Sequence, residues 1–394
     1  MTPGSGLLDW LFAQSRGGLP RNPARARELL AQLGAPDRNF RSMLVVGTNG
    51  KGSVCTMLEA GLIQQGGPPT GCFTSPHLQV FEERIRVDGQ RIQRRRTEQF
   101  IRSRMEEPGT FAFFELSLGL ACSYFAEQGV GVAVMEAGVG GRGDATAALG
   151  EVELVLITNV SLDHTATLGA SIREIATEKA GAIRPGKAVL TTARGEGLEV
   201  LRAVAASKKA PLYAPGDHPE LFRLPHPPRL AGQHQITNAQ LALAGLRFLG
   251  REEGIEAALG AEHPGRLECQ AWRGRTLWLD GAHNPAAAQA LAESVGQVDL
   301  LIFGIMARKD ARQTLAPLLE ISKRRIYTWP GTGGLDPELL RTLAAGEVAE
   351  GAELALEAAY QLTQPGETIL VAGSLHLVGA IKDLLGVDRG AVGR

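Results

Sequence analysis

Residues Leu44 to Val54 read LVVGTNGKGSV, and this stretch decides how the chain begins to fold. An apolar run, which predicts a buried strand, meets a glycine-rich turn, and a serine then opens a predicted helix. A turn of this kind aims several backbone N–H groups at one point, where the helix dipole also favours an anion. The stretch therefore predicts a strand-to-helix junction that binds phosphate.

Lysine 51 gives this turn its chemistry. Its ammonium group would reach the β- and γ-phosphates of a nucleotide, and the hydroxyl of Ser53 would face Mg²⁺. The pattern GxxxxGK[ST] is not met literally, because Val45 stands where its first glycine belongs and Gly52 separates the lysine from the serine. The alternative is a tight connection that binds nothing. The predicted nucleotide-binding residues of the turn are Gly47, Thr48, Asn49, Gly50, Lys51, Gly52 and Ser53.

Length, composition and charge limit the classes of protein to which this chain could belong. A chain of 394 residues is longer than one hydrophobic core usually organises, so about two domains are expected. The net charge of −1 supplies no large field for nucleic acid or an anionic membrane, and Arg94 to Arg96 are expected to form a solvated turn. No apolar run reaches the ~18 residues of a membrane span, and the start lacks a signal-like segment. We therefore expect a cytoplasmic protein without nucleic-acid or membrane partners.

Apolar runs and helical segments alternate along the whole sequence, which is the pattern of a parallel α/β sheet. The first series has strands at Met43 to Val46, Val130 to Glu136, Leu154 to Thr158 and Ala188 to Thr191, with helices at Val54 to Gln65, Phe111 to Gln128, Ile172 to Ile183 and Thr237 to Leu249. The second has strands at Leu277 to Leu279, Leu300 to Phe303, Arg325 to Thr328 and Thr368 to Val371, with helices at Ala286 to Val295, Ala311 to Leu319 and Pro337 to Leu343.

The two series predict two domains. A helix at Ile255 to Leu259 is interrupted by proline and glycine in EHPGRLE, Glu262 to Glu268, and a fresh strand series follows. We therefore expect a phosphate-loop, parallel-sheet ATPase domain over residues 1–263, followed by a smaller Rossmann-like α/β domain over residues 264–394. The four cysteines lack CxxC spacing and are expected to be reduced thiols.

The variant phosphate loop resembles that of the Mur ligase superfamily, and among its members it is most similar to folylpolyglutamate synthase and dihydrofolate synthase. Further matching motifs follow in order: FTSPHLQVFEERIRVDG from Phe73, TFAFFELSLGLA from Thr110, MEAGVGGRGDAT from Met135, ITNVSLDHTATLG from Ile157, EKAGAIRPG from Glu178, GQHQITNAQLAL from Gly232, PGRLE from Pro264, LDGAHNP from Leu279 and AGSLHLVG from Ala372. These motifs cover nearly the whole chain.

The resemblance implies an ATP-dependent ligase that adds L-glutamate to dihydropteroate or to a reduced folate. Amide formation from a carboxylate is uphill in water, and transfer of the γ-phosphoryl group gives an acyl phosphate that an amine can attack. A monomer is expected. One alternative is another Mur-type amino-acid ligase that acts on a UDP-linked wall precursor; the FTSPHL loop and the roughly forty residues before the phosphate loop, too few for a UDP-binding domain, argue against it. Another is a nucleotide switch, which would need no second domain carrying LDGAHNP.

Phosphoryl transfer needs charge neutralisation, so the site is expected to contain ligands for Mg²⁺. Glu115 lies in an apolar helix, where an unpaired charge would cost several kcal/mol, and a cation is expected to face it; the alternative is a glutamate that faces solvent. His164 follows a strand, where a loop or N-cap histidine is the alternative. Both match metal ligands of the family, together with Ser53. Lys179 would ordinarily face solvent, but the resemblance implies that CO₂ carbamylates it and that it then holds a second Mg²⁺.

Further residues match the nucleotide and acceptor sites of the family. Gln235 and Asn238, three apart on a helix, would face the adenine, with an exposed polar turn as the alternative. Arg266, Asp280 and His283 would reach ATP from the second domain when the domains close, with a helix N-cap as the alternative for the aspartate.

The expected folate-binding residues are Thr74, Ser75, Pro76, His77, Arg84 and Asp144, the last as a partner for the pterin amines. This sequence has Ala147 where relatives commonly have asparagine, which removes a polar group near the acceptor.

Overall fold

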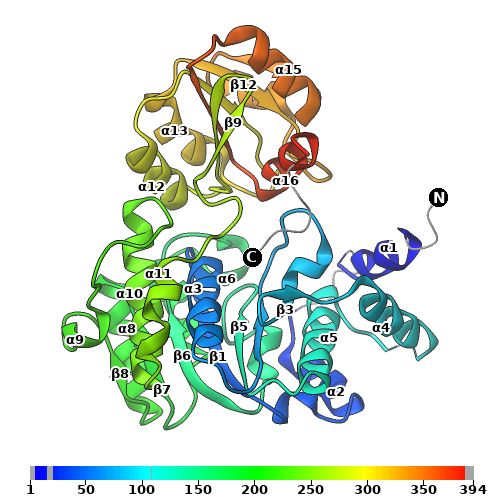
Figure 1. Cartoon of the computed structure of the whole chain (residues 1–394), viewed down its shortest axis with the longest axis vertical. Coiled ribbons are helices and arrows are strands. Elements are labelled where there is room, and N and C mark those ends of the chain that lie inside the picture. The colour runs from blue at the N-terminus through cyan, green and yellow to red at the C-terminus, as the bar shows by residue number, and fades with distance from the viewer. Residues whose placement is uncertain (1–4, 16–20, 108, 387–394) are drawn as a thin grey trace.

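Two mostly parallel sheets form the frame of the protein (Figure 1). The computed structural model describes residues 5–15, 21–107 and 109–386. We call the part built on the first sheet the N-terminal lobe and the part built on the second sheet the C-terminal lobe. The α/β fold expected from the sequence is confirmed. Among the described residues, no helix is long and apolar enough to cross a membrane.

The N-terminal lobe contains an eight-stranded sheet in the order β4-β3-β2-β5-β1-β6-β7-β8. Its strands are β1 (Arg41–Val46), β2 (Thr70–Phe73), β3 (Ile85–Val87), β4 (Gln90–Arg91), β5 (Val132–Glu136), β6 (Val152–Ile157), β7 (Ala188–Thr191) and β8 (Leu212–Tyr213). The strand β1 lies between β5 and β6 and pairs with both in parallel. The strands β3 and β4 run antiparallel to their neighbours at one edge.

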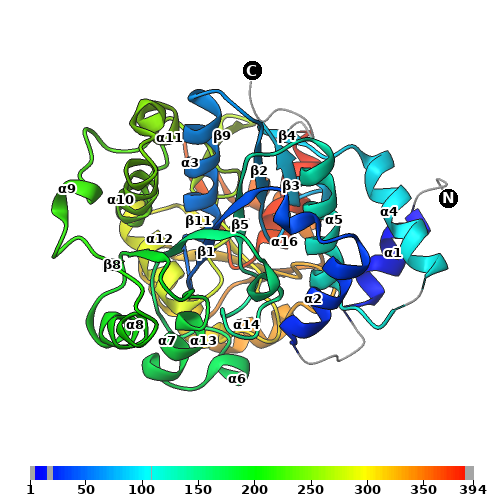
Figure 2. The same ribbon diagram turned by 90° about the horizontal axis from the view of Figure 1, so that it is seen from below.

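Helices cover both faces of this sheet. The helices of the lobe are α1 (Ser5–Ala13), α2 (Pro23–Gln32), α3 (Lys51–Gln64), α4 (Arg94–Glu106), α5 (Phe113–Glu127), α6 (Thr165–Leu168), α7 (Ile172–Ala180), α8 (Gly195–Ser207), α9 (Pro219–Phe222), α10 (Gln233–Phe248) and α11 (Ile255–Leu259), with 3₁₀ turns at Pro36–Arg38, Phe81–Arg84, Ala145–Ala148 and Glu252–Gly254. Successive residues of β1 point to opposite faces. Met43 and Val45 belong to the apolar cluster that includes residues of α3, α10 and α11, while Leu44 and Val46 belong to the one that includes residues of α2 and α5. These two groups of helices lie on opposite sides of the sheet (Figure 2).

The C-terminal lobe repeats this arrangement on a smaller scale, with a six-stranded sheet in the order β13-β12-β11-β14-β10-β9. Its strands are β9 (Glu268–Trp272), β10 (Arg275–Leu279), β11 (Leu300–Phe303), β12 (Arg324–Thr328), β13 (Glu347–Ala349) and β14 (Thr368–Ala372), and its helices are α12 (Pro285–Val295), α13 (Ala311–Ile321), α14 (Pro337–Leu343), α15 (Ala352–Leu362) and α16 (Leu375–Leu384). All neighbouring strands are parallel except β9 and β10. The helices α12 to α14 cover one face, and α15 and α16 cover the other.

A short connection joins the lobes. On the N-terminal side, Nδ1 of His263 lies 2.7 Å from Oγ1 of Thr56 on α3. On the C-terminal side, the carbonyl of Gly265 accepts a hydrogen bond from the N–H of Gly281 at 3.0 Å. Pro264 alone separates these two anchored residues. The expected domain boundary between residues 263 and 264 falls in this connection and stays a prediction.

One local expectation is wrong. Arg94, Arg95 and Arg96 form the first turn of the helix α4 and not a solvated turn. The buried residues of this helix, Thr97, Ile101 and Arg104, recur at helical spacing, but only one of them is apolar. The sequence therefore lacks the regularly spaced apolar residues that would predict this helix, although the helix packs against α1.

Candidate active site

A cavity of about 670 Å³ lies between the lobes and takes its lining from both. Parallel sheets bind ligands at the carboxyl ends of their strands, and the loops after β1, β5, β6, β10 and β11 all contribute to this cavity. Of the predicted site residues, the structure brings the following to the cavity: Gly47, Thr48, Asn49, Gly50, Lys51, Gly52, Ser53, Ser75, Pro76, Arg84, Glu115, Asp144, His164, Lys179, Gln235, Asn238, Arg266, Asp280 and His283. Thr74 and His77 are not part of the lining.

The phosphate loop connects β1 to α3, and glycine is required at two of its positions. A Cβ on Gly47 would lie 1.8 Å from Oγ1 of Thr158, and a Cβ on Gly50 would lie 2.1 Å from Oδ1 of Asn238. Gly50 also has a left-handed backbone, with φ of +82°, at the N-cap of α3. The ammonium group of Lys51 donates to the carbonyls of Gly47 and Thr48, at 3.2 Å each. The loop thus holds its lysine at the start of a helix, where anions bind.

The loop after β6 braces the phosphate loop. The side-chain oxygen of Asn159 accepts the N–H of Asn49 at 2.9 Å, and Thr158 donates its hydroxyl to the carbonyl of Asn49 at 2.6 Å. The N–H of Thr48 donates to the carbonyl of Asn159 at 3.0 Å. These bonds fix the backbone of the turn before any ligand arrives, which is what a preorganised anion site requires.

Glu115 does not face solvent. Its side chain is 4% exposed and forms an ion pair with Arg25 of α2, with Nη2 and Oε1 2.8 Å apart. The carboxylate also accepts the N–H of Ala112 at 2.8 Å, which satisfies a free donor at the start of α5. The cation expected opposite this glutamate is therefore Arg25, which the sequence did not identify.

Lys179 is buried, against the ordinary expectation for a lysine on a helix. Its side chain is 2% exposed. Burial, followed by the nearby charge of Lys51, lowers the pKa of its amine from 10.5 to about 7. Much of this amine is therefore neutral and nucleophilic at neutral pH.

His164 stands where the chain enters α6. It occupies the N-cap position with a left-handed backbone, φ of +50°, but its side chain forms no capping bond, so the N-cap alternative does not explain it. Burial, followed by the charge of Lys309, lowers the pKa of its imidazole to about 4. A neutral imidazole is the form that binds a metal ion.

Gln235 and Asn238 are buried in the first turns of α10, so the alternative of an exposed polar turn is wrong. The amide of Asn238 donates to Oε1 of Gln235 at 2.9 Å. The pair faces the cavity beside the phosphate loop and keeps amide groups available for hydrogen bonding to a ligand.

Asp280 and His283 lie between β10 and α12, and the alternative of a helix cap for the aspartate is also wrong. Asp280 accepts the N–H of Leu267 and the N–H of Ala282, each at 2.8 Å, and the residue that caps α12 is Asn284. Asp280 thereby ties the strand end to the interlobe connection. His283 donates from Nδ1 to the carbonyl of Gly281 at 2.7 Å, and burial lowers its pKa to about 4.

The expected folate-binding residues lie on two loops that meet at the cavity, one after β2, which we call the acceptor loop, and one after β5, which carries Asp144. Arg84 donates from Nε to Nδ1 of His77 at 2.8 Å, so His77 lies behind the arginine and orients it. The hydroxyl oxygen of Thr74 accepts a hydrogen bond from the guanidinium group of Arg86. Both carboxylate oxygens of Asp144 already accept hydrogen bonds from Val139 and Thr146 of its own loop. Asp144 therefore shapes this loop first of all.

The cavity also contains charged residues that the sequence reading missed, among them Glu136, Asp163 and Lys309. Glu136 ends β5, is 3% exposed and accepts the N–H of Ser75 at 2.8 Å. Burial raises the pKa of this carboxyl group. Asp163 and Lys309 form an ion pair between the lobes at 2.6 Å. A signal existed for each, because Glu136 is the last residue of an apolar strand, and Asp163 and Lys309 lie in the loops that follow the carboxyl ends of two others.

Comparison with known protein families gives two matches along the chain. Residues 45–188 match the Mur ligase middle domain, and residues 265–375 match the glutamate ligase domain of Mur ligases. A Mycobacterium tuberculosis dihydrofolate synthase/folylpolyglutamate synthase is 30% identical over 97% of this chain and 93% of its own length. A Haloferax volcanii protein described as bifunctional folylpolyglutamate synthase/dihydropteroate synthase is 32% identical over 94% of this chain, which spans only 49% of that relative.

Solved structures with the same fold include ligand complexes. The Mycobacterium tuberculosis folylpolyglutamate synthase complexed with ADP has a TM-score of 0.86 and 29% identity, covering 98% of this chain and 99% of its own. An Escherichia coli chain in complex with DHPP and ADP has a TM-score of 0.85 and 27% identity, with 98% of both chains covered. A Yersinia pestis bifunctional folylpolyglutamate synthase/dihydrofolate synthase complexed with AMPPNP and Mn has a TM-score of 0.85 and 26% identity, covering 98% of this chain and 99% of its own.

Proposed function

Because this chain belongs to the Mur ligase family, among the folylpolyglutamate synthases and dihydrofolate synthases, we propose that it joins L-glutamate to dihydropteroate or a reduced folate with ATP. The observation that carries the proposal is a cavity that combines a phosphate loop with charged groups from both lobes. The structures of one relative with ADP and of another with AMPPNP and Mn support the binding of a nucleotide and a divalent metal here.

The reaction follows from the weakness of a carboxylate as an electrophile. An oxygen of the substrate carboxylate attacks the γ-phosphorus of ATP, the bond to the β-phosphate oxygen breaks, and ADP leaves. The amine of glutamate, having lost a proton, then attacks the acyl carbon, and inorganic phosphate leaves as the amide forms. Lys51 and the N–H groups at the start of α3 would hold the β- and γ-phosphates. Arg266 would bind phosphate from the C-terminal lobe.

The residues present fit Mg²⁺ in chemical kind. Ser53, Glu115 and His164 offer a hydroxyl, a carboxylate and a neutral imidazole to one cavity. No group of three or more His, Cys, Asp or Glu side chains in the described ranges could hold a metal by itself. A site that borrows oxygen ligands from ATP and water is the ordinary arrangement for Mg²⁺. When bound, Mg²⁺ would neutralise charge on the transferred phosphoryl group.

A second Mg²⁺ would need one more anionic ligand, and we propose carbamylated Lys179. Carbamylation requires a neutral amine, because its nitrogen lone pair attacks CO₂ and the nitrogen then releases a proton. The buried amine with a pKa of about 7 satisfies this requirement, whereas an exposed lysine would be charged. The product would carry a negative charge beside Lys51, where the unmodified amine is neutral or positive.

We propose which residues recognise the adenine and the folate or dihydropteroate from the positions of these residues at the cavity. Gln235 and Asn238 would hydrogen-bond to the adenine, and Asp280 and His283 would approach the nucleotide from the other lobe. Ser75, Pro76 and Arg84 would flank the folate or dihydropteroate, with Thr74, His77 and Asp144 supporting their loops. We further propose that the protein acts as a monomer, since the residues of one chain line the cavity from both lobes.

Mass spectrometry of the products tests this function. Dihydropteroate and tetrahydrofolate would each be incubated with ATP, Mg²⁺ and glutamate, and products heavier by one or more glutamyl residues are expected from one or both. The Lys51→Ala variant is the control for a contaminating ligase. ATP hydrolysis without a glutamylated product from either substrate would reject the proposal.

A further inference from the structure

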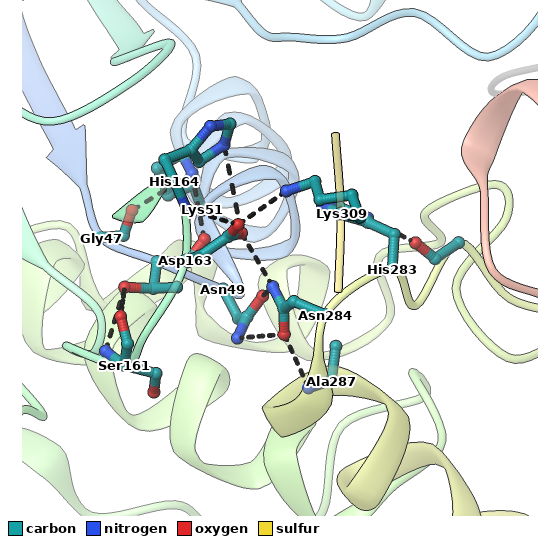
Figure 3. A network of polar contacts seen from close by, with 12 residues as sticks. Gly47, Asn49, Lys51, Ser161, Asp163, His164, His283, Asn284, Ala287 and Lys309 are labelled. Atoms are coloured by element: carbon teal, nitrogen blue, oxygen red, sulfur yellow. Dashed lines mark hydrogen bonds and ion pairs between the residues drawn. The ribbon is translucent and has the colours of Figure 1, made fainter. Parts of the chain in front are cut away.

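A cluster of four side chains joins the lobes at the phosphate loop (Figure 3). Asn49 and Asp163 come from the N-terminal lobe, and Asn284 and Lys309 come from the C-terminal lobe. We call these four residues the docking cluster. Asn49, Asp163 and Lys309 line the cavity, and Asn284 follows His283 of the lining. The chemistry proposed above gives no task to Asp163, Asn284 or Lys309.

Asp163 is the centre of the docking cluster. Its Oδ1 accepts from Nζ of Lys309 at 2.6 Å, and its Oδ2 accepts from Nδ2 of Asn284 at 2.9 Å. The side chains of Asp163 and Lys309 are each 8% exposed. A buried carboxylate needs partners for its charge and lone pairs. Here the partners that the C-terminal lobe supplies are one cation and one amide, on different elements.

Asn284 uses both ends of its side-chain amide. Its oxygen accepts the N–H of Ala287 at 2.9 Å and so caps the helix α12. Its nitrogen donates to Asp163 and also to Oδ1 of Asn49 in the phosphate loop, at 2.8 Å. The helix start of one lobe is thereby bonded directly to the phosphate-binding turn of the other.

The docking cluster also reaches the backbone of the expected metal ligand. The N–H of His164 donates to Oδ1 of Asp163 at 2.7 Å, the same oxygen that receives Lys309. His164 has a left-handed backbone, a conformation that needs support from its surroundings. The position of the C-terminal lobe and the conformation of two active-site loops are therefore linked through one carboxylate.

We propose that Asn284 and Lys309 are positioning residues that dock the C-terminal lobe on the phosphate loop through Asp163. Docking sets the distance between the lobes and holds Asn49 and His164 in place at the same time. The benefit to catalysis rests on the proposed function, because it requires a reaction in the cavity. The docking itself is a property of the fold and can be measured without any substrate.

A second contact between the lobes would remain if the docking cluster were broken. Leu78 packs against the cluster of apolar residues that includes α16, and Gln79 donates to Asp383 at 3.0 Å. This contact lies on the acceptor loop and does not involve the docking cluster. Without docking, the lobes should therefore pivot over a wider range and not separate.

Two substitutions remove docking by different means. Asn284→Asp keeps an oxygen that caps α12, since aspartate is as good an N-cap as asparagine, but it loses both donor bonds and places a second carboxylate against Asp163. Lys309→Met keeps an unbranched side chain, one atom shorter, and removes its charge. Lys309→Arg retains the charge and should rescue docking. Lys323→Met removes an exposed lysine of the same lobe and serves as the matched control.

Spin labels on the two lobes would report docking directly. Cysteines introduced at the exposed residues Lys187 and Leu354 would carry the labels, in a Cys269→Ser background, because Cys269 is exposed whereas the other cysteines are buried. Pulsed electron paramagnetic resonance would measure the distance distribution between labels in protein without added nucleotide. Thermal melting would verify that each variant is folded.

A narrow distribution is expected for the parent protein, Lys309→Arg and Lys323→Met, and a broader or longer one for Asn284→Asp and Lys309→Met. A folded Asn284→Asp protein with the parent distribution would overturn the proposal, even if Lys309→Met were too unstable to measure. Since no substrate is used, a failed glutamate ligation assay would leave this result unaffected, so the two proposals fail separately.

Discussion

The buried amine of Lys179 gives the sharpest test of the electrostatics of the cavity. The substitution Lys179→Met keeps an unbranched side chain and removes the charge. Burial, then the charge of Lys51, lowers the pKa of this amine from 10.5 to about 7. Holding the charged amine in the folded protein therefore costs about 5 kcal/mol, at roughly 1.4 kcal/mol for each tenfold change in proton affinity.

The sign of the pH dependence follows from the two pKa values. Below about pH 7 the amine is protonated in both the folded and the unfolded chain, and the folded protein bears the whole cost. Between pH 7 and pH 10.5 only the unfolded chain is protonated, so the stability of the parent protein rises with pH. The methionine variant lacks this titration. This variant should therefore be more stable than the parent protein at low pH. The difference between their free energies of unfolding should shrink by about 2 to 3 kcal/mol from about pH 6.5 to about pH 9.

Urea unfolding at a series of pH values measures this difference. The buffers should be free of CO₂, because CO₂ would trap the neutral amine and change the titration. Lys187→Met, which removes an exposed lysine of the same lobe, is the control and should show no trend. A difference between Lys179→Met and the parent that stays constant over this pH range would refute the reasoning.

Lys51→Ala should abolish glutamate-dependent ADP release while the circular dichroism spectrum stays unchanged, and full activity would reject the role of the phosphate loop. Glu115→Ala should raise the Mg²⁺ concentration needed for ADP release much more than it changes the KM for folate; an unaltered Mg²⁺ titration would exclude it as a ligand. Arg86→Met should cost about 3 to 5 kcal/mol in urea unfolding, because it strands Glu59, which is 4% exposed and pairs with it at 2.7 Å. Breaking the exposed pair of Arg173 and Glu196 by Arg173→Met should cost less than about 1 kcal/mol, and equal losses would contradict this contrast.

Sequence patterns predicted the elements whose apolar residues keep a regular spacing. The strand β11 and the helix α14 have the bounds expected, because a short apolar run and a proline at a helix start are local signals. The edge strand β9 was missed, since its residues alternate between intermediate and exposed positions and include few strongly apolar side chains. Elements of this kind form because a neighbouring strand offers them hydrogen bonds, which the sequence does not display.

In the site, too, residues with a local signal were predictable and residues brought together by packing were not. The phosphate loop was predictable because its chemistry lies in consecutive residues. Glu115 was expected to face a cation, but Arg25 is 90 positions away, and Lys309 is 146 positions from Asp163. Such pairs depend on how helices and lobes pack in three dimensions. A sequence can show that a buried charge needs a partner without showing which residue provides it.

The connection around Pro264 limits the ways in which the two lobes can move. Bonds at His263 and Gly265 anchor the chain on either side, and proline fixes one of the few torsions that remain. Motion about so short a hinge is a swing, in which displacement grows with distance from the axis. Arg266, two residues from Pro264, would stay near its place throughout the swing, whereas residues farther from the axis would travel longer arcs.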